Sequence, residues 1–420
     1  MKILVIGGGG RCHAICEKLK NSPKNPQIYC APGNAGMANI ATLVPIGDSE
    51  IEKLLQFALD EKIDMTVVGP EIPLSMGIVD LFESHNLAVF GPRKNAAKIE
   101  WSKEFAKDLM AKYDIPTAEY AVFEDYEPLA QYIEKVGVPI VLKFDGLAYG
   151  KGVVVCDTIE LARESAVKML KDRVFGAGKV VCEECLIGPE FSFMCLVNDE
   201  IVLPLDIAQD HKRELDGDKG ENTGGMGAYS GVPFITKEDV DYTFSEIMVK
   251  TVQALKAEGA PFKGVLYGGL MKTPKGIKVI EFNARFGDPE TEVVLPRMKS
   301  DLVEVLENLL EGKKSELEFY EEVTVGVVLA SKNYPRNYEK GFEISGLENV
   351  EIPVYHMGTK LEDGVLKTNG GRVLFAVAKG KTFKEAQQNC YKEIAKIQCE
   401  NLFCRKDIAW QVINFQNENL

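Results

Sequence analysis

No stretch of the sequence is long and apolar enough to cross a bilayer, and the first apolar run, residues 3–6, is followed at once by glycines. This run is too short for the apolar region of a signal peptide, so we expect a cytoplasmic protein. Positive charge is also scarce, because 49 basic residues stand against 63 acidic ones and the net charge is −14. This sign disfavours nucleic acid and anionic membranes as partners, so an anionic ligand needs a local basic pocket.

The ten cysteines lack the arrangement of a disulfide framework, since they lie mostly in apolar segments that resemble strands or helices. Cys182 and Cys185 form a CxxC pair, but no second pair accompanies them and two glutamates share the segment. We therefore expect free thiols that pack in the interior, and neither a metal site nor a redox site at this pair.

The order of apolar and polar segments predicts an α/β fold class with about two to four domains. The first hundred residues alternate short apolar segments with helical patterns, which is typical of a parallel sheet built from βαβ units. Mixed strand and helix patterns follow, and a smaller α+β pattern ends the chain. We predict domains at residues 1–100, 101–312 and 322–420, with no internal repeat.

The segment VIEFNARFGDPETE, residues 279–292, begins as a strand and ends in a polar turn. Alternation places Glu281, Asn283 and Arg285 on one face of the strand and apolar residues on the other. Mg²⁺ prefers oxygen ligands, which suits the Glu281 carboxylate and the Asn283 side-chain carbonyl. The guanidinium of Arg285 can bind a carboxylate or a phosphoryl oxygen and stabilise developing charge. A polar strand face exposed to water is the competing interpretation, and it is preferred for such a row taken alone.

A glycine-rich loop, DGLAYGKG, follows a predicted buried strand that contains Lys143. Gly146, Gly150 and Gly152 allow backbone N–H groups to approach phosphate oxygens, and Lys151 adds positive charge. The loop is not a P-loop, because only three residues separate Gly146 from Gly150 and no Ser or Thr follows Lys151. We predict a flap between two strands that closes over a nucleotide, with a plain hairpin turn as the alternative.

The segment VCEECLIGPEFS supplies Glu183, Glu184 and Glu190 beside a predicted strand. Carboxylates and backbone groups at a strand edge can bind the amino group and the ribose hydroxyls of adenosine. Surface glutamates are common, so this segment alone is weak support for a nucleotide site.

Two further segments, QDHKR at 209–213 and NTGGMGAYS at 222–230, are polar and glycine-rich. Lys212 and Arg213 offer cationic contacts, and the glycines of the second segment allow close approach of a ligand to the backbone. A flexible surface loop is an equally good interpretation of either segment alone.

The first glycines, in ILVIGGGGRCHA, have the strand–glycine–helix order of a dinucleotide site. The third glycine of that fingerprint is absent, and the second predicted strand ends without an acid, so NAD is disfavoured. A helix N-terminus with Arg11 beside it remains, which is a natural place for a single phosphate. His13 in this segment is better explained as a packed helix residue.

Together these segments closely resemble the phosphoribosylamine–glycine ligase family of the ATP-grasp superfamily. The motifs GGGGRCHA, APGNAG, VGPE, FGP, DGLAYGKGV, QDHKR, NTGGMGAYS, EFNARFGDPET, TNGGRVL and CRKDIAW occur in the order and spacing of that family. The resemblance implies an N-terminal parallel βαβ domain, an ATP-grasp α+β domain with a lid subdomain at about 117–190, and a small C-terminal α+β domain.

The implied reaction is a step of de novo purine biosynthesis. ATP phosphorylates glycine to glycyl phosphate, and the amine of 5-phosphoribosylamine attacks it to give glycinamide ribonucleotide, ADP and phosphate. Another ATP-grasp carboxylate–amine ligase is the alternative, and a nucleotide-binding protein without activity would lack the pair Glu281 and Asn283. The implied partners are these small molecules and a divalent cation, Mg²⁺ or Mn²⁺.

The resemblance also assigns residues by their position in the motifs. The implied metal ligands are Glu281 and Asn283, and the implied catalytic residues are Arg285 and Lys143. The implied ATP contacts are Lys103, Lys143, Gly146, Gly150, Lys151, Gly152, Glu183, Glu184, Leu186 and Glu190. The implied substrate contacts are Gly10, Arg11, Asn34, Glu71, Lys212, Arg213, Asn222, Gly225, Gly227 and Arg285.

Three positions depart from the pattern of the family. Cys12 stands where the family usually has Glu, Tyr149 lies in a loop that usually reads AAGKG, and Glu292 replaces the usual Gln or Met. We expect these departures to alter substrate affinity more than the class of reaction.

Overall fold

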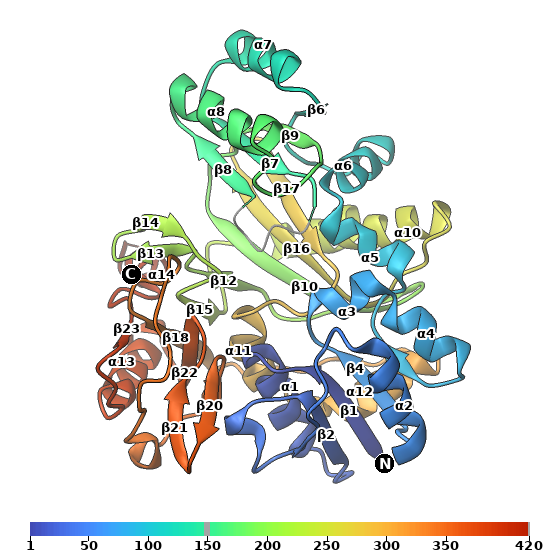
Figure 1. Cartoon of the computed structure of the whole chain (residues 1–420), viewed down its shortest axis with the longest axis vertical. Coiled ribbons are helices and arrows are strands. Elements are labelled where there is room, and N and C mark those ends of the chain that lie inside the picture. The colour runs from blue at the N-terminus through green and yellow to red at the C-terminus, as the bar shows by residue number, and fades with distance from the viewer. Residues whose placement is uncertain (147–151, 419–420) are drawn as a thin grey trace.

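The N-terminal region forms a five-stranded sheet in the order β3-β2-β1-β4-β5, and every pair of neighbours is parallel (Figure 1). The alternating pattern predicted this sheet correctly. Its central strands are buried except at Lys2, the first residue of β1, because apolar residues occupy most positions on both of their faces. The elements are β1 (Lys2–Gly7), α1 (Gly10–Lys20), β2 (Gln27–Pro32), η1 (Ala35–Met37), β3 (Thr42–Leu43), α2 (Ile51–Glu61), β4 (Met65–Val68), α3 (Glu71–Met76), α4 (Ile78–Ser84) and β5 (Val89–Phe90).

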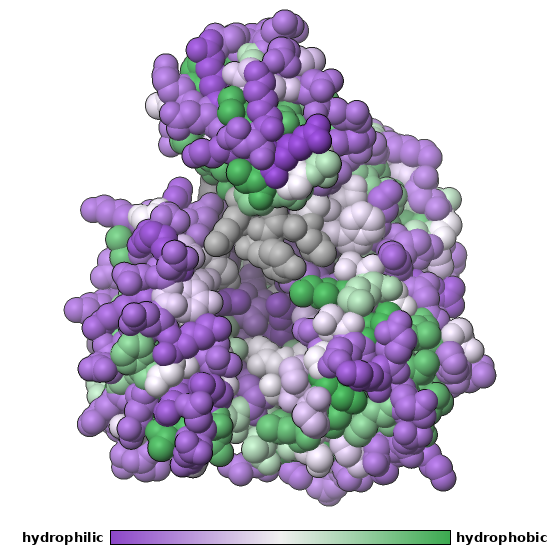
Figure 2. Space-filling model, viewed as in Figure 1, coloured by the Kyte–Doolittle hydropathy of each residue, from purple (hydrophilic) through white to green (hydrophobic). Residues whose placement is uncertain are grey.

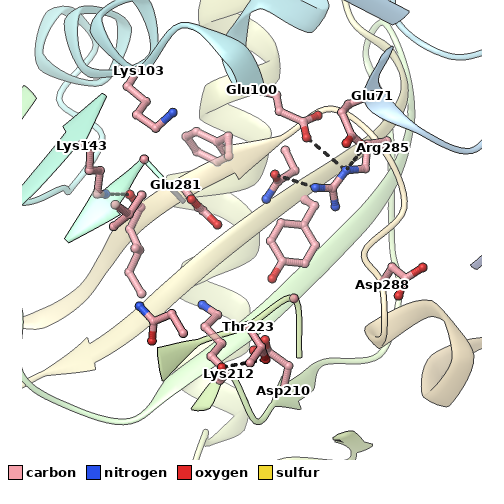
Figure 3. A pocket seen from close by; sticks show the side chains of 18 of the residues that line it. Glu71, Glu100, Lys103, Lys143, Asp210, Lys212, Thr223, Glu281, Arg285 and Asp288 are labelled. Atoms are coloured by element: carbon pink, nitrogen blue, oxygen red, sulfur yellow. Dashed lines mark hydrogen bonds and ion pairs between the residues drawn. The ribbon is translucent and has the colours of Figure 1, made fainter. Parts of the chain in front are cut away.

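Two helices lead from this sheet into the next region, α5 (Lys94–Trp101) and α6 (Lys103–Lys112). Ser102 separates them, and its side chain accepts a hydrogen bond from the N–H of Phe105 and so caps α6. This break turns the first residue of α6, Lys103, toward the centre of the molecule (Figure 3).

A small lobe, residues 118–184, stands above the rest of the molecule in Figure 1. Its antiparallel sheet has the order β6-β9-β7-β8, and two helices pack on it. The elements are β6 (Tyr120–Phe123), α7 (Tyr126–Val136), β7 (Ile140–Phe144), β8 (Val153–Cys156), α8 (Ile159–Ala166), η2 (Val167–Lys171) and β9 (Val180–Glu184). The structure describes residues 1–146 and 152–418, so the centre of the predicted flap between β7 and β8 lies outside the described residues.

One large antiparallel sheet joins the central region to the C-terminal region. Its order is β17-β16-β10-β12-β15-β18-β22-β19, with β11 paired to β10 and β23 paired to β18. The strands are β10 (Glu190–Asn198), β11 (Ile201–Pro204), β12 (Ala208–Asp210), β15 (Gly227–Ser230), β16 (Lys263–Thr273), β17 (Gly276–Asn283), β18 (Val323–Ser331), β19 (Val354–His356), β22 (Arg372–Gly380) and β23 (Leu402–Phe403). Strands after residue 322 therefore continue the central sheet.

Shorter elements complete these regions. Two ribbons pair β13 (Arg213–Leu215) with β14 (Lys219–Asn222), and β20 (Thr359–Glu362) with β21 (Val365–Thr368). The remaining helices are α9 (Lys237–Tyr242), η3 (Thr243–Val249), α10 (Lys250–Ala257), α11 (Glu290–Val294), η4 (Leu295–Arg297), α12 (Leu302–Leu310), η5 (Leu347–Asn349), α13 (Phe383–Ile394) and α14 (Trp410–Glu418).

The buried apolar residues that the structure describes form two separate clusters. The larger one is continuous from Ile3 in β1 to Val412 in α14, so the N-terminal, central and C-terminal regions share one core. The smaller one lies within the small lobe. All ten cysteines are free, as the sequence predicted, and among the described residues no helix is long and apolar enough to cross a membrane.

Candidate active site

A cavity of about 970 Å³ lies where the small lobe, the central sheet, the N-terminal region and the C-terminal region meet. Figure 2 shows this face of the molecule hollowed between the small lobe and the regions below it, with hydrophilic residues at the visible part of the hollow. Cations and carboxylates dominate the lining (Figure 3). The cations are Arg11, Lys103, Lys107, Lys143, Lys212, Arg285, Arg336, Lys340 and Arg372. This is the local concentration of positive charge that an anionic ligand needs in a chain of negative net charge.

A β-bulge in β17 turns the predicted polar row toward this cavity. Gly269 of β16 pairs with Glu281, but the next residue of β16, Leu270, pairs with Val279, so Ile280 is an extra residue. After the bulge the burial alternates as predicted, with Glu281 and Asn283 lining the cavity and Phe282 in the core. The carbonyl of the extra residue, Ile280, accepts a hydrogen bond from Lys143 Nζ at 2.9 Å. The bulge therefore both aims Glu281 and fixes a lysine of the small lobe beside it.

Glu281 carries its negative charge among cations. Burial raises the pKa of this carboxyl, but Lys212, Lys143 and Lys103 outweigh burial and hold the pKa below its usual value. Within the described residues, no hydrogen bond or ion pair occupies the Glu281 carboxylate. An ionised and unoccupied carboxylate is the donor that a divalent cation requires.

Asn283 adds a second oxygen on the same strand face. Its Oδ1 accepts a hydrogen bond from Arg285 Nη2 at 3.1 Å, which orients the amide. The described residues contain no cluster of three or more His, Cys, Asp or Glu that could enclose a metal ion. The donor set is thus two protein oxygens facing an open cavity, which suits Mg²⁺ or Mn²⁺ completed by phosphate oxygens and water, and not a cation enclosed by protein.

Arg285 lies just past the end of β17 and is held between two carboxylates (Figure 3). Its Nε lies 3.1 Å from Glu100 Oε1 and 3.6 Å from Glu71 Oε2. Burial alone lowers the pKa of the guanidinium, but these two acids raise it above its usual value. Burial raises the pKa of Glu100, and Arg285 opposes that rise. Helix α5 and the first residue of α3 thereby fix the guanidinium at the cavity wall.

Three charged residues form a buried group between the body of the molecule and the small lobe. Glu183 Oε2 lies 2.9 Å from Lys107 Nζ and 3.0 Å from Lys143 Nζ, and all three side chains are nearly inaccessible to solvent. Burial lowers the pKa of Lys107 to about 8, although Glu183 opposes that change. The second oxygen of Glu183 is buried without a hydrogen-bond partner among the described residues. It is therefore available to a ligand donor.

Lys212 reaches the same cavity from the segment between β12 and β13. It forms an ion pair with Glu190 at 2.7 Å. Burial lowers the pKa of Lys212, but Glu190 and Asp210 outweigh burial and raise it well above its usual value. Burial raises the pKa of Asp210 to about 7, against the charge of Lys212. Lys212 thus keeps its charge while facing Glu281.

The N-terminal and C-terminal regions meet at Asp288, in the turn after β17. Arg11 of α1 donates to the carbonyl of Phe286 at 2.8 Å and lies 3.6 Å from the Asp288 carboxylate. Arg372 of β22 pairs with Asp288 at 2.8 Å and donates to the carbonyl of Gly224 at 2.7 Å. One carboxylate therefore joins the beginning of α1, the end of the polar row and the glycine-rich segment after β14.

The structure brings more than half of the predicted residues together in the cavity lining. These are Arg11, Glu71, Lys103, Lys143, Gly146, Gly152, Glu183, Lys212, Asn222, Glu281, Asn283 and Arg285. Predicted residues that the described structure places outside the lining are Gly10, Asn34, Glu184, Leu186, Glu190, Arg213, Gly225 and Gly227. Gly150 and Lys151 lie outside the described residues.

Several residues outside the lining have structural partners instead. Asn34 donates to the carbonyls of Gly8 and His356 and accepts from Gly36, so its side chain fixes the turn after β2. Glu184 pairs with Lys278 at 2.9 Å. Arg213 donates to the carbonyl of Gly220 within its own ribbon. Gly225 and Gly227 pack against Pro289 and Ile408, where a Cβ atom would lie 2.6 Å from either side chain.

The sequence analysis did not single out Glu100, Lys107, Tyr267 or Arg372 as individual site residues. Arg372 lies in the motif TNGGRVL, so the motif carried a signal for it. Lys107 stands one helical turn after Lys103, and that spacing alone places both on one face of α6. Glu100 and Tyr267 reach the cavity only through the tertiary arrangement, and no local pattern identifies them.

Comparisons with known proteins agree with this architecture. Family models described as the N, ATP-grasp (A) and C domains of phosphoribosylglycinamide synthetase match residues 1–100, 101–291 and 324–411. Curated relatives named phosphoribosylamine–glycine ligase include one from Halalkalibacterium halodurans, 52% identical over 98% of this chain and 97% of the relative. Another, from Caldanaerobacter subterraneus subsp. tengcongensis, is 51% identical over 97% of this chain and 99% of the relative.

A solved structure of phosphoribosylamine–glycine ligase from Thermotoga maritima superposes with a TM-score of 0.86 at 35% identity, covering 97% of this chain and 100% of that one. A biotin carboxylase from Campylobacter jejuni, at 14% identity and a TM-score of 0.73, shares the fold; it covers 100% of this chain and 96% of that one. The resemblance seen in the motifs and the predicted fold class are thus confirmed. The chain belongs to the phosphoribosylamine–glycine ligase family, whose members are ATP-dependent ATP-grasp ligases also called phosphoribosylglycinamide synthetases.

Proposed function

We propose that this cavity joins glycine to 5-phosphoribosylamine at the expense of ATP, through glycyl phosphate, and releases glycinamide ribonucleotide, ADP and phosphate. The observation that carries the proposal is the row Glu281, Asn283 and Arg285, which faces a cavity lined by Lys103 and Lys143. The row combines oxygen ligands for a cation with a guanidinium for an acyl phosphate, and two lysines stand where ATP phosphates need charge.

ATP binds, in this proposal, between the small lobe and the strands β16 and β17. Lys103 and Lys143 contact its phosphates, with the loop that contains Gly146, Gly150, Lys151 and Gly152 as the lid. The unoccupied oxygen of Glu183 accepts a hydrogen bond from the adenosine, because it is buried at the cavity wall and lacks a partner among the described residues. Glu184, Leu186 and Glu190, on the segment that leaves the lobe, complete the adenosine site.

Glu281 and Asn283 are the proposed ligands of Mg²⁺ or Mn²⁺, since both oxygens face the cavity and the Glu281 carboxylate is ionised and unoccupied. A divalent cation bound there supplies positive charge that neutralises the transferring phosphoryl group. Lys143 and Lys212 hold the surrounding potential positive. Arg285, fixed by Glu100 and Glu71, binds the carboxylate of glycine and then the acyl phosphate that forms from it.

The phosphoribosylamine site is proposed at the N-terminus of α1, where Gly10 offers a backbone N–H group and Arg11 a guanidinium to its phosphate. The backbone N–H of Arg11 itself donates to Asp288 Oδ2 at 3.4 Å. Glu71 lines this end of the cavity, and Asn34, which lies outside the lining, fixes the turn after β2 beside it. Lys212, Arg213, Asn222, Gly225 and Gly227 lie on the segments that close it from the other side. No side chain acts as a covalent nucleophile, because the intermediate is carried on glycine; the protein contributes positioning and charge stabilisation.

An ADP-release assay with each substrate omitted in turn tests the proposal. We expect ADP formation to require ATP, a divalent cation, glycine and 5-phosphoribosylamine together. ADP formation that ignores glycine, or that proceeds equally with other amino acids, would instead indicate a different carboxylate–amine ligase. We also infer a cytoplasmic location and these small molecules as partners, in keeping with a biosynthetic ligase.

A further inference from the structure

The motif CRKDIAW near the end of the chain has no part in the proposed reaction, yet it contains a large and fully buried side chain, that of Arg405. Its guanidinium forms two bonds of 2.8 Å to the Asp407 carboxylate and an ion pair of 2.9 Å with Asp218, in the turn between β13 and β14. It also donates to the backbone carbonyl of Arg213 at 3.0 Å. Apolar residues often replace a buried ionic group without loss of stability, so this group requires an explanation beyond stability.

The residue that precedes Lys212 is bound to the same segment. His211 is buried, and its Nε2 accepts a hydrogen bond from the backbone N–H of Ala409 at 2.8 Å. Burial lowers the pKa of His211, although Asp218 opposes this change, so the ring is neutral. Because Nε2 is the acceptor, the proton lies on Nδ1, 3.9 Å from Asp218 Oδ1. The ring is therefore held in one tautomer by the C-terminal segment.

Ala409 has a backbone conformation that residues with a side chain disfavour. Its φ is +69°, in the left-handed region, and the residue is completely buried. Such a conformation persists only where the surrounding contacts impose it. Here the N–H of Ala409 donates to His211, and its carbonyl accepts from the N–H of Ile413 in α14. Backbone strain is thus maintained at the point where the C-terminal segment contacts the residue next to Lys212.

Both neighbours of Lys212 are therefore anchored to residues 405–409, which follow them by 192 and 198 residues in the chain. Lys212 itself lines the cavity, as Glu281 does (Figure 3). Its carbonyl accepts hydrogen bonds from the N–H and the hydroxyl of Thr223, at 2.7 and 2.9 Å. Its side chain pairs with Glu190 at 2.7 Å and interacts with Glu281. The backbone on each side of this cavity lysine is thus fixed by a distant part of the chain.

We propose that Arg405 and His211 are positioning residues, which hold the backbone beside Lys212 so that its ammonium group stays close to Glu281. This inference rests on the proposed function, in which Lys212 keeps the potential around the transferring phosphoryl group positive. Neither Arg405 nor His211 lines the cavity, so their effect on the reaction passes through Lys212. A displacement of about 1 Å in such a group can reduce a rate by roughly 100-fold, so an anchor outside the cavity has a measurable effect.

A double-mutant cycle between His211 and Lys212 tests this inference in the full chain. His211→Leu removes the acceptor for the Ala409 N–H and should lower kcat/KM for 5-phosphoribosylamine about tenfold. Lys212→Met should lower it about 100-fold, because it removes the charge itself. The double variant should be no less active than Lys212→Met alone, since the anchor has no function without the lysine. Effects that multiply to a loss of about 1000-fold would overturn the inference, because His211 would then act independently of Lys212.

The substitution His211→Gln separates positioning from packing. The amide oxygen of glutamine can accept from the Ala409 N–H as Nε2 does, so kcat/KM should stay within about threefold of the wild type. Glu393→Leu in α13 is the matched control, because it also removes a buried side-chain acceptor from a backbone N–H, that of Glu351, at 2.7 Å. It should lower the unfolding temperature about as much as His211→Leu does and leave kcat/KM within about twofold of the wild type. A control that lost as much activity as His211→Leu would overturn the inference.

Arg405→Lys provides a second cycle with Lys212→Met, which decides the matter if His211→Leu does not fold. Lysine keeps the charge and lacks the planar fork that binds Asp407 and the carbonyl of Arg213 together. Its effect should again disappear in the absence of Lys212. Multiplying effects in a protein that still requires glycine and 5-phosphoribosylamine for ADP release would overturn the positioning role and leave the ligase assignment intact. ADP release by the wild type without glycine would overturn the proposed function, and with it the inference that rests on it.

Discussion

The small lobe and the body of the molecule have separate apolar cores, and charged contacts join them. The body has one apolar core shared by the N-terminal, central and C-terminal regions, whereas the lobe has a core of its own. Charged contacts join the two: Lys107 with Glu183, Lys278 with Glu184, and Lys179 with Glu104. Lys143 of the lobe also donates to the carbonyl of Ile280 in the body. Two bodies joined by hydratable groups separate at less cost than two halves of one apolar core, so this boundary permits the lobe to act as the proposed lid.

The largest expected effect is a loss of turnover on substitution of Glu281, which lies in the body. Glu281→Ala should reduce kcat by at least about 10³-fold at saturating ATP, because it removes a proposed metal ligand and with it the charge that neutralises the phosphoryl group. Its unfolding temperature should fall only modestly, since the carboxylate has no hydrogen bond or ion pair within the described residues and loses only its longer-range attraction to Lys212, Lys143 and Lys103. ADP release and thermal unfolding measure both. Wild-type turnover in this variant would move the metal site to another part of the molecule.

A core substitution in the lobe should destabilise the lobe and leave the stability of the body unchanged. Leu142→Ala in β7 removes a fully buried side chain of the small core and should destabilise the lobe by about 2–4 kcal/mol. Hydrogen exchange should accelerate in β7 and β9 while β1 and β18 keep their protection.

The matched control for this substitution is Leu306→Ala in α12, an equally buried leucine of the large core. It should accelerate exchange in the body and leave the lobe protected. Equal acceleration of exchange in β7 and β18 for either variant would show that lobe and body unfold as one unit. The claim that their cores are independent would then be wrong.

Removal of one buried charge at the boundary between lobe and body should reduce stability by a somewhat smaller amount. Lys107→Met leaves Glu183 with one cation where it had two, so we expect a loss of about 2 kcal/mol, below the roughly 3–5 kcal/mol typical of a buried pair broken completely. The KM for ATP should also rise, because Glu183 then binds Lys143 alone and its orientation changes. Lys112→Met, on the exposed side of the same helix, is the control and should change stability by less than about 1 kcal/mol. A Lys107→Met variant as stable as this control would mean that the lobe does not depend on the buried group.

Within the body, the substitution Cys12→Glu tests the α1 end of the cavity. The Cys12 side chain is fully buried and its sulfur contacts the carbonyl of Ile6, so a glutamate places a further carboxyl close to the Asp288 and Arg11 charges. We expect the affinity for 5-phosphoribosylamine to fall about tenfold and the affinity for ATP to stay unchanged. Steady-state KM values for both substrates measure this. A change of equal size in the KM for ATP would show that this end of the cavity is not confined to the phosphorylated amine.

The polar row shows how far the sequence alone can predict this site. Alternation correctly places Phe282, Ala284 and Phe286 in the core, opposite Glu281 and Asn283. Strict alternation from Val279, which is also buried, would place Glu281 in the core as well, and only the bulge at Ile280 reverses the face. A bulge depends on the pairing with β16, so a single strand's sequence does not reveal it.

The order of βαβ segments and the motif spacing also predicted the parallel N-terminal sheet and the family. Contacts between distant regions were not predictable in the same way. Arg372 reaches Asp288 across 84 residues, and Glu183 reaches Lys107 across the boundary of the lobe. These side chains meet only because the large sheet and the lobe sheet bring their strands to one cavity. Local pattern fixes neither arrangement.

The smallest expected effect lies on the outer surface of the lobe. Glu134 and Arg163 form an ion pair at 2.7 Å, but both side chains are about half exposed. Water and salt screen such a pair, so Glu134→Gln should change stability by less than about 0.5 kcal/mol, with no change in the KM for ATP. Urea unfolding and steady-state kinetics measure the two quantities. This pair is exposed, whereas the pair of Lys107 with Glu183 is buried. The ratio of the stability changes in Glu134→Gln and Lys107→Met therefore measures how much burial strengthens a charged contact. A Glu134→Gln variant that matched Lys107→Met in both quantities would remove that distinction.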